Sequence, residues 1–100
     1  MQFVVIGHDG RDDKALDRRL AAREAHLATF RENHARGVFL YAVALLDDGG
    51  TMNGSIIVCD FVSEEALKKE WLDTEPYVLG RVWESVEIRK GMVPPLLLGT

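Results

Sequence analysis

Arg23 and His26 are the residues of this sequence whose types and spacing best suit acid-base chemistry. They lie three residues apart in a stretch that predicts a helix, and side chains at that spacing are neighbours on a helix surface. An imidazole titrates near neutral pH and can act as a general base, while the planar guanidinium of arginine binds anions and developing oxyanions. The pair therefore predicts a small polar pocket. Two other interpretations of Arg23 stay open: a structural ion pair, and a side chain that extends into solvent.

The helix that carries this pair is predicted over residues 12–35, because a long run of helix-forming residues ends just before Gly37. At about 100° per residue, its large apolar side chains fall on one stripe roughly 80° wide, with Arg23 near the centre and His26 on the edge. These side chains are Leu16, Leu20, Leu27 and Phe30. An arginine directed toward a core needs an anionic partner or a pocket, because its desolvation is costly. His34 is expected to interact with the last helix carbonyls and is not assigned to the site.

Further candidate site residues lie near the ends of predicted strands. His8 and Asp9 follow the first strand, where they could line the mouth of the pocket, although a turn or capping role for Asp9 stays equally open. Ser55, on the third strand, could add a hydrogen bond to a substrate. His8, Asp9 and His26 match no compact metal-ligand spacing, and the sequence has no Gly-rich phosphate loop and no nucleophile elbow. We therefore expect neither a metal nor another cofactor.

The order of the predicted elements indicates an α+β domain of the ferredoxin-like type, with four antiparallel strands in one sheet and two helices on one face. Apolar, β-branched runs indicate the strands, Ser63 suits a helix N-cap, and Pro76 interrupts the helical region that follows it. The expected elements are a strand over 2–7, the helix over 12–35, strands over 38–46 and 51–61 joined by a tight turn at 47–50, a helix from Ser63 to about Leu72, and a strand over 82–89. We expect one domain over residues 1–100, with an apolar tail over 91–98 that covers part of a surface.

The second predicted strand is apolar on both of its faces, which predicts cover on both sides of the sheet. Strict alternation assigns Val38, Leu40, Ala42, Ala44 and Leu46 to one face, and Phe39, Tyr41, Val43 and Leu45 to the other. The helices can cover one face only, so a second copy of the chain is the simplest cover for the other. We therefore expect a homodimer packed sheet to sheet.

Composition disfavours several classes of partner. The scattered basic residues and the net charge of −4 at pH 7 are unsuited to nucleic acid and to strongly anionic membrane surfaces. Cys59 is the only cysteine, so it can form no internal disulfide, and its apolar neighbours indicate a buried side chain. The apolar stretch 1–7 lacks basic residues and is too short to span a bilayer, so a cytoplasmic location is expected.

Three short motifs, taken together, resemble the YciI-like (YCII-related) family. They are Arg23-Glu24-Ala25-His26-Leu27, then Gly54-Ser55, and then Glu75-Pro76-Tyr77-Val78 followed by Gly80. Their order and spacing agree with the family across nearly the whole chain. The resemblance implies a ferredoxin-like fold assembled as a dimeric α/β barrel, related in architecture to muconolactone isomerases and small barrel monooxygenases. Most members have no assigned activity, and one branch is similar to a dehydrochlorinase that acts on a chlorinated hydroxyhydroquinone.

The resemblance also implies roles for individual residues. His26 matches the histidine implicated in proton transfer, and Glu75 stands where the family usually has the partner aspartate. The extra methylene of a glutamate moves its carboxylate by about one ångström, which matters for the position of the imidazole. Asp9 matches an acid that follows the first strand in the family, and Tyr77 is either a packed core residue or a wall of the pocket. The hairpin over 42–47 lacks a Gly-Pro that many members carry, so substrate preference does not transfer.

These residues support a leading hypothesis and two alternatives. The leading one is a cofactor-independent lyase or isomerase for a small oxygenated cyclic or aromatic compound. In it, His26 moves the proton, Glu75 together with Asp9 holds the tautomer of the imidazole, and Arg23 stabilises an oxyanion. The main alternative is a non-catalytic module that binds a small anion through Arg23 and His26. A third, a barrel monooxygenase, would need a pocket large enough for a planar ligand. The catalytic hypothesis predicts a histidine that is hydrogen-bonded to a carboxylate inside a concave pocket.

Overall fold

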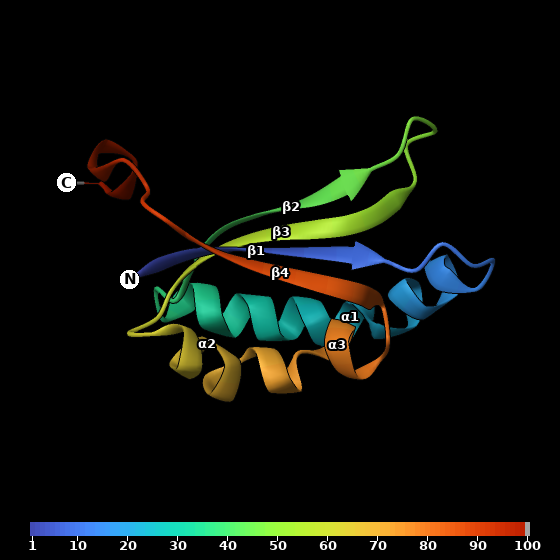
Figure 1. The fold of residues 1–100 in the computed structure, drawn as a ribbon, viewed down its shortest axis with the longest axis horizontal. Helices are drawn as coiled ribbons and strands as arrows, with labels where there is room; N and C mark the ends of the chain where they lie inside the picture. The colour runs from blue at the N-terminus through green and yellow to red at the C-terminus, as the bar shows by residue number, and fades with distance from the viewer. Residues whose placement is uncertain (100) are drawn as a thin grey trace.

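The computed structural model describes residues 1–99, and its strands and helices follow the predicted order, with one additional short helix before the last strand. Its elements are β1 (Gln2–Asp9), α1 (Ala15–Ala35), β2 (Phe39–Leu46), β3 (Met52–Asp60), α2 (Glu64–Glu70), the 3₁₀ turn η1 (Leu72–Thr74), α3 (Pro76–Leu79), β4 (Trp83–Gly91) and the 3₁₀ turn η2 (Pro95–Leu98). Figure 1 shows two layers, with the sheet above and α1, α2 and α3 all below it. No helix within the described residues is long and apolar enough to cross a membrane.

The sheet has the order β2-β3-β1-β4, and every neighbouring pair is antiparallel. This arrangement confirms the predicted ferredoxin-like α+β class. Alternate residues of each strand point toward the helices and form one side of the core. The buried sheet residues Phe3, Val5, Phe39, Ile57 and Cys59 pack together with the buried helix-side residues Leu67, Trp71, Leu72 and Tyr77.

β2 departs from the alternation that the sequence predicts. The pairing with β3 shifts between Phe39 and Tyr41, so that Phe39 lies opposite Cys59 while Ala42 lies opposite Ile57. Since Cys59 and Ile57 are both in the core, Phe39 joins the even-numbered Ala42 on the helix-facing side. The predicted split of β2 by odd and even numbers is therefore wrong at its first residues, because a β-bulge adds one residue and reverses the alternation.

The segment between β3 and β4 also differs from the prediction of one helix ending near Leu72. Ser63 caps α2 as predicted, and its Oγ accepts a hydrogen bond from the Ala66 amide at 3.0 Å. However, α2 ends at Glu70, and after the turn η1 a new helix, α3, begins at Pro76. Proline suits the first position of a helix, because it needs no backbone N–H there and its φ is already helical. This break places Glu75 at the N-terminus of α3, next to the core.

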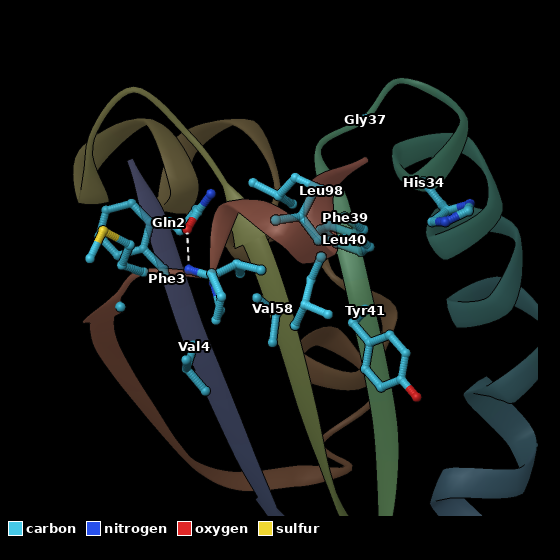
Figure 2. Close-up of a pocket in the computed structure, with 15 residues that line it drawn as sticks. Gln2, Phe3, Val4, His34, Gly37, Phe39, Leu40, Tyr41, Val58 and Leu98 are labelled. Atoms are coloured by element: carbon cyan, nitrogen blue, oxygen red, sulfur yellow. Dashed lines mark hydrogen bonds between the residues drawn. The ribbon is translucent and has the colours of Figure 1, made fainter. Parts of the chain in front are cut away.

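The sheet face away from the helices is largely apolar, and the C-terminal tail lies over one end of it. Figure 2 shows this region. The tail, Val4, Tyr41 and Val58 surround a hollow of about 750 Å³. The Val93 amide donates a hydrogen bond to the Gln2 side-chain oxygen, which ties the tail to β1. The tail therefore covers part of a surface, as predicted. The rest of this face stays uncovered in a single chain.

Candidate functional site

The inward face of α1 carries Arg19 and His26, which are only 2% and 8% exposed. This differs from the predicted stripe, because Leu16 and Leu20 are 38% and 53% exposed and Arg23 is also exposed. Arg19 and His26 are seven residues apart, two helical turns, and so lie on the same face. Counting apolar residues favoured the leucines, but the sheet supplies partners that compensate for burying a charge. The prediction that Arg23 lies at the centre of the inward face is therefore wrong.

His26 is hydrogen-bonded to Glu75, the acid at the start of α3. His26 Nδ1 lies 2.9 Å from Glu75 Oε2, and the Glu75 side chain is completely buried. A carboxylate only accepts hydrogen bonds, so Nδ1 carries a proton and donates it. The lone pair of the neutral ring is then on Nε2, which has no hydrogen-bond partner among residues 1–99. This tautomer is the one that a histidine needs to act as a base.

Two further donors hold the Glu75 carboxylate in place. Its Oε1 accepts from Trp71 Nε1 at 3.0 Å, and its Oε2 also accepts from the Tyr77 amide at 2.7 Å. The second bond makes Glu75 the N-cap of α3, in spite of its longer side chain. The extra methylene relative to aspartate is thus accommodated, and the carboxylate still reaches the imidazole.

Aromatic rings fix the plane of the imidazole. The Tyr77 ring stacks on His26 with the centroids 3.9 Å apart and the planes within 5° of each other. The Trp83 ring contacts the His26 ring edge to face, with the ring centroids 6.1 Å apart. It contacts the Tyr77 ring in the same way, with the centroids 5.6 Å apart. A Cβ on Gly7 would lie 2.4 Å from the Trp83 ring, so only glycine lets this ring pack against β1. With its plane held, His26 has little freedom to turn away from Glu75.

Arg19 links the same site to the sheet. Its Nε donates to Asp9 Oδ2 at 2.9 Å, and its Nη2 donates both to Ser55 Oγ at 2.7 Å and to the Gly54 carbonyl. Its guanidinium carbon also lies 4.8 Å from the centre of the Tyr77 ring, a cation–π distance. Asp9 and Ser55 therefore act first as partners of Arg19, a residue that the sequence analysis did not select.

The hollow of this site has a volume of about 230 Å³ and opens between α1 and the sheet. This is below the range of about 300–1,000 Å³ typical of drug-sized ligands, so it suits a compound of about one ring. One part of its wall is polar, formed by Arg19, Arg23, His26, Ser55 and Tyr77. The other part is apolar and includes Leu27, Phe30, Ala42, Ala44, Met52 and Ile57.

The structure places the predicted site residues unequally around this hollow. His26, Arg23, Ser55 and Tyr77 line it, and Glu75 supports His26 from behind. Asp9 contacts it only through Arg19. His8 is exposed on the opposite face of the sheet, because alternate residues of a strand point to opposite sides and its neighbour Asp9 points inward. The expectation that His8 lines the pocket is therefore wrong.

Burial affects the two titratable groups that flank His26 and Arg19. It raises the pKa of the Tyr77 hydroxyl above its ordinary value, although the nearby Arg19 and Arg23 partly oppose this shift. The hydroxyl therefore stays protonated at neutral pH and is available as a donor. Burial also raises the pKa of the Asp9 carboxyl, and Arg19 is the first of the charges that oppose it. Within residues 1–99, no cluster of three or more His, Cys, Asp or Glu could hold a metal ion.

Sequence reasoning missed Arg19 and the tryptophans, and only Arg19 left a signal in the sequence. The spacing of seven between Arg19 and His26 predicts a shared helix face, and Asp9 is a natural partner for an inward arginine. Trp71 and Trp83 bracket the Glu75 segment in sequence, but nothing local indicates that they contact it. Their contacts depend on how η1, α3 and β4 return to the core.

Comparisons with known proteins identify the family and the relatives of this chain. A family model described as the YCII-related domain matches residues 1–91. Two relatives are both named Protein YciI, one from Escherichia coli O6:H1 and one from Shigella flexneri. Each is 35% identical to this chain over 95 residues, which cover 89% of this chain and 94% of the relative.

Among solved structures, the chain is similar to 5-chloro-2-hydroxyhydroquinone dehydrochlorinase from Burkholderia phenoliruptrix AC1100, in its complex with 2,5-dihydroxybenzoquinone. The TM-score is 0.79 at 17% identity, with 96% of this chain and 98% of that chain covered. At this identity the likeness shows a common fold and no more. The family match and the sequence relatives go further, and they show that this chain belongs to the YCII-related domain family.

Proposed function

We propose that this protein is a cofactor-independent lyase or isomerase that moves a proton on a small oxygenated cyclic or aromatic compound. The observation that carries the proposal is the 2.9 Å contact between His26 Nδ1 and the buried Glu75 carboxylate, beside a hollow that His26 lines. Nε2 takes a proton from the substrate, and Glu75 stabilises the imidazolium that results. The proton then returns to another atom of the substrate or leaves with the product.

The remaining wall residues suit the binding of an oxygenated ring. Tyr77 and Ser55 bring hydroxyl groups to the hollow, and Arg23 brings a positive charge at its solvent side. Leu27, Phe30 and their apolar neighbours can contact the carbon skeleton. A ligand of this class, 2,5-dihydroxybenzoquinone, is bound by the dehydrochlorinase that has the same fold. The size of the hollow agrees with a single ring.

The test combines turnover and binding on a panel of phenols, quinols, hydroxyquinones and ring carboxylates. We expect one class of compound to turn over with the wild type, followed by ultraviolet absorbance, and kcat to fall about 10²–10⁴-fold in His26→Gln, because the base is lost. The matched control is His34→Gln. It changes a histidine of the same helix that does not line the 230 Å³ hollow beside His26.

Three outcomes would count against this proposal. If panel members bind the wild type but none turns over, and His26→Gln binds them equally well, the acid-base proposal fails. A wild type that binds anions through His26 without turnover would instead support a non-catalytic binding module. Turnover that survives in His26→Gln would show that another group moves the proton.

We further propose that the uncovered sheet face packs against a second copy of the chain. Tyr41 is 69% exposed and Val43 is 45% exposed on this face, and the half-buried Ile56 and Val58 lie beside them on β3. An apolar face of this kind is unusual in a protein that works as a monomer. Packing two such faces together removes both from water. The hollow beside His26 lies on the helix side of each sheet, away from this interface.

Sedimentation equilibrium tests this packing. We expect the wild type to have the mass of a dimer and Tyr41→Lys to have that of a monomer, because a charge would be buried at the interface. The control is Leu79→Lys, which changes a residue that is 65% exposed on α3, in the helix layer. A monomeric wild type, or a Tyr41→Lys variant that stays dimeric, would contradict sheet-to-sheet packing.

A further inference from the structure

We propose that Arg19 is a ligand-anchoring residue, which presents one guanidinium nitrogen to a single negatively charged oxygen on a ring-sized ligand, a phenolate or an enolate. The inference concerns the same hollow as the proposed function and rests on it for the class of ligand. It adds a residue that no motif selects, and it limits the geometry of the ligand's charged group.

The hydrogen bonds of Arg19 leave one nitrogen free. Nε is taken by Asp9, and Nη2 is shared between Ser55 Oγ and the Gly54 carbonyl. Nη1 has no partner among residues 1–99. Within that range, Asp9 Oδ1 is the only fully buried side-chain nitrogen or oxygen that lacks a partner, so Nη1 is not fully buried. Because Arg19 lines the hollow, Nη1 is the nitrogen that it can offer to a ligand.

This pattern selects for one oxygen instead of two. A carboxylate binds an arginine most strongly through a fork, with two parallel N–H···O bonds from two nitrogens. In Arg19 the protein already occupies Nε and Nη2, so the ligand meets Nη1 alone. A phenolate or enolate oxygen needs only one such contact. Arg19 therefore favours these oxyanions relative to a carboxylate of similar size.

The surroundings of Arg19 make this contact strong and well oriented. The side chain is 2% exposed, so little water competes for it, and an interaction with charge is worth more in such a site. Asp9, Ser55 and the Gly54 carbonyl hold the guanidinium before any ligand arrives, which reduces the entropy that binding costs. Arg19 and His26 both contact the Tyr77 ring and both line the hollow, so an oxygen held by Nη1 occupies the same hollow as the proposed base.

The experiment compares two probes of the same shape, para-nitrophenolate and its neutral methyl ether para-nitroanisole, by calorimetric titration. We expect the wild type to prefer the phenolate, and Arg19→Lys to weaken phenolate binding about tenfold while changing the ether by less than about twofold. The matched control is Arg18→Lys, since Arg18 is bonded to Asp12 and to the Arg81 carbonyl away from the hollow. It should leave both affinities unchanged.

A measurement on the unmodified protein covers the case in which Arg19→Lys does not fold. In the ¹⁵N-labelled wild type, the side-chain N–H signals of Arg19 should shift on addition of para-nitrophenolate and not on addition of para-nitroanisole. A wild type with no preference for the phenolate, equal losses for both probes in Arg19→Lys, or a preference that disappears only in Arg23→Gln would overturn the proposal.

The two proposals fail in different ways. If His26→Gln keeps the preference for the phenolate and no compound turns over, the acid-base function fails and the anchor stands. If turnover depends on His26 but Arg19→Lys binds both probes as the wild type does, the anchor fails and the acid-base function stands.

Discussion

Replacing Glu75 with glutamine probes the centre of the site most directly. Glu75 is fully buried, and its carboxylate accepts hydrogen bonds from Trp71 Nε1, the Tyr77 amide and His26 Nδ1. Glutamine has almost the same shape, but it has one acceptor oxygen and one NH₂ group that only donates. Whichever way the amide turns, at least one of the three donors faces another donor.

The expected loss of stability follows from these contacts. The best arrangement keeps the amide oxygen at the position of Oε2, so that Tyr77 and His26 retain an acceptor while Trp71 Nε1 loses its partner. A hydrogen bond to a charged group is worth about 1.5–3 kcal/mol, and the two that remain become weaker because the charge is gone. We expect Glu75→Gln to lower the free energy of unfolding by about 3 kcal/mol.

Urea unfolding followed by tryptophan fluorescence measures this change, because Trp71 and Trp83 are both buried. The control is Glu70→Gln, which changes an exposed glutamate at the end of α2 and should alter stability by less than about 0.5 kcal/mol. A double-mutant cycle with His26→Gln should give a coupling of about 0.5–3 kcal/mol, as expected for groups in one network. If Glu75→Gln is as stable as the control, Glu75 is not bonded as described, and the basis for its role beside His26 is lost.

Three further predictions follow from buried residues elsewhere in the site and core. Gly7→Ala should lower the free energy of unfolding by about 1–3 kcal/mol, because the new Cβ meets the Trp83 ring at 2.4 Å and forces it to move. Burial raises the pKa of the Cys59 thiol to about 12, so iodoacetamide should alkylate the native protein at least about a hundredfold more slowly than the urea-unfolded chain, as followed by mass spectrometry. Burial raises the pKa of the Asp9 carboxyl above its ordinary value of 3.8, so the native state holds the carboxyl proton more tightly than the unfolded state does. The free energy of unfolding of the wild type, relative to that of Asp9→Asn, should therefore fall as the pH rises from below 3.8 through the pKa of the folded state.

Each of these predictions has a control variant or an outcome that would contradict it. Gly49→Ala, where a Cβ meets only the Asp47 carboxylate oxygen at 3.4 Å, should cost less than Gly7→Ala, and equal costs would argue against the packing of Trp83 on β1. Fast alkylation of native Cys59 would mean that β3 opens readily. The control for Asp9→Asn is Asp13→Asn, which changes an exposed aspartate on the loop before α1 and is measured over the same pH range. A relative stability that rises with pH would mean that the ion pair with Arg19 outweighs burial.

The predicted fold was confirmed because several local signals agreed with one topology. The β-branched runs, the turn at 47–50 and the cap at Ser63 each reflect short-range chemistry that does not depend on distant residues. The errors lie where longer-range packing competes with these signals. The bulge in β2 is set by pairing with β3, and the break before Pro76 is set by what Glu75 and Trp71 contact in the core.

The candidate site shows the same division. His26 and Glu75 were selected from residue type and from the family resemblance, and the structure places them 2.9 Å apart. His8 and Arg23 were assigned from approximate positions on a strand and a helix. Their side chains turned out to be exposed, since one residue along a strand or about 100° around a helix changes what a side chain faces.

By itself, the sequence determined the four strands, the long first helix and the start of the second, their order, and the presence of a histidine and an acid able to share a proton. Only the tertiary structure decided which charged residue enters the core. Arg19 is buried because Asp9, Ser55 and the Gly54 carbonyl, from two neighbouring strands, supply the acceptors that its guanidinium needs. The cost of burying a charge depends on partners that are distant in sequence, so no pattern within one helix can predict it.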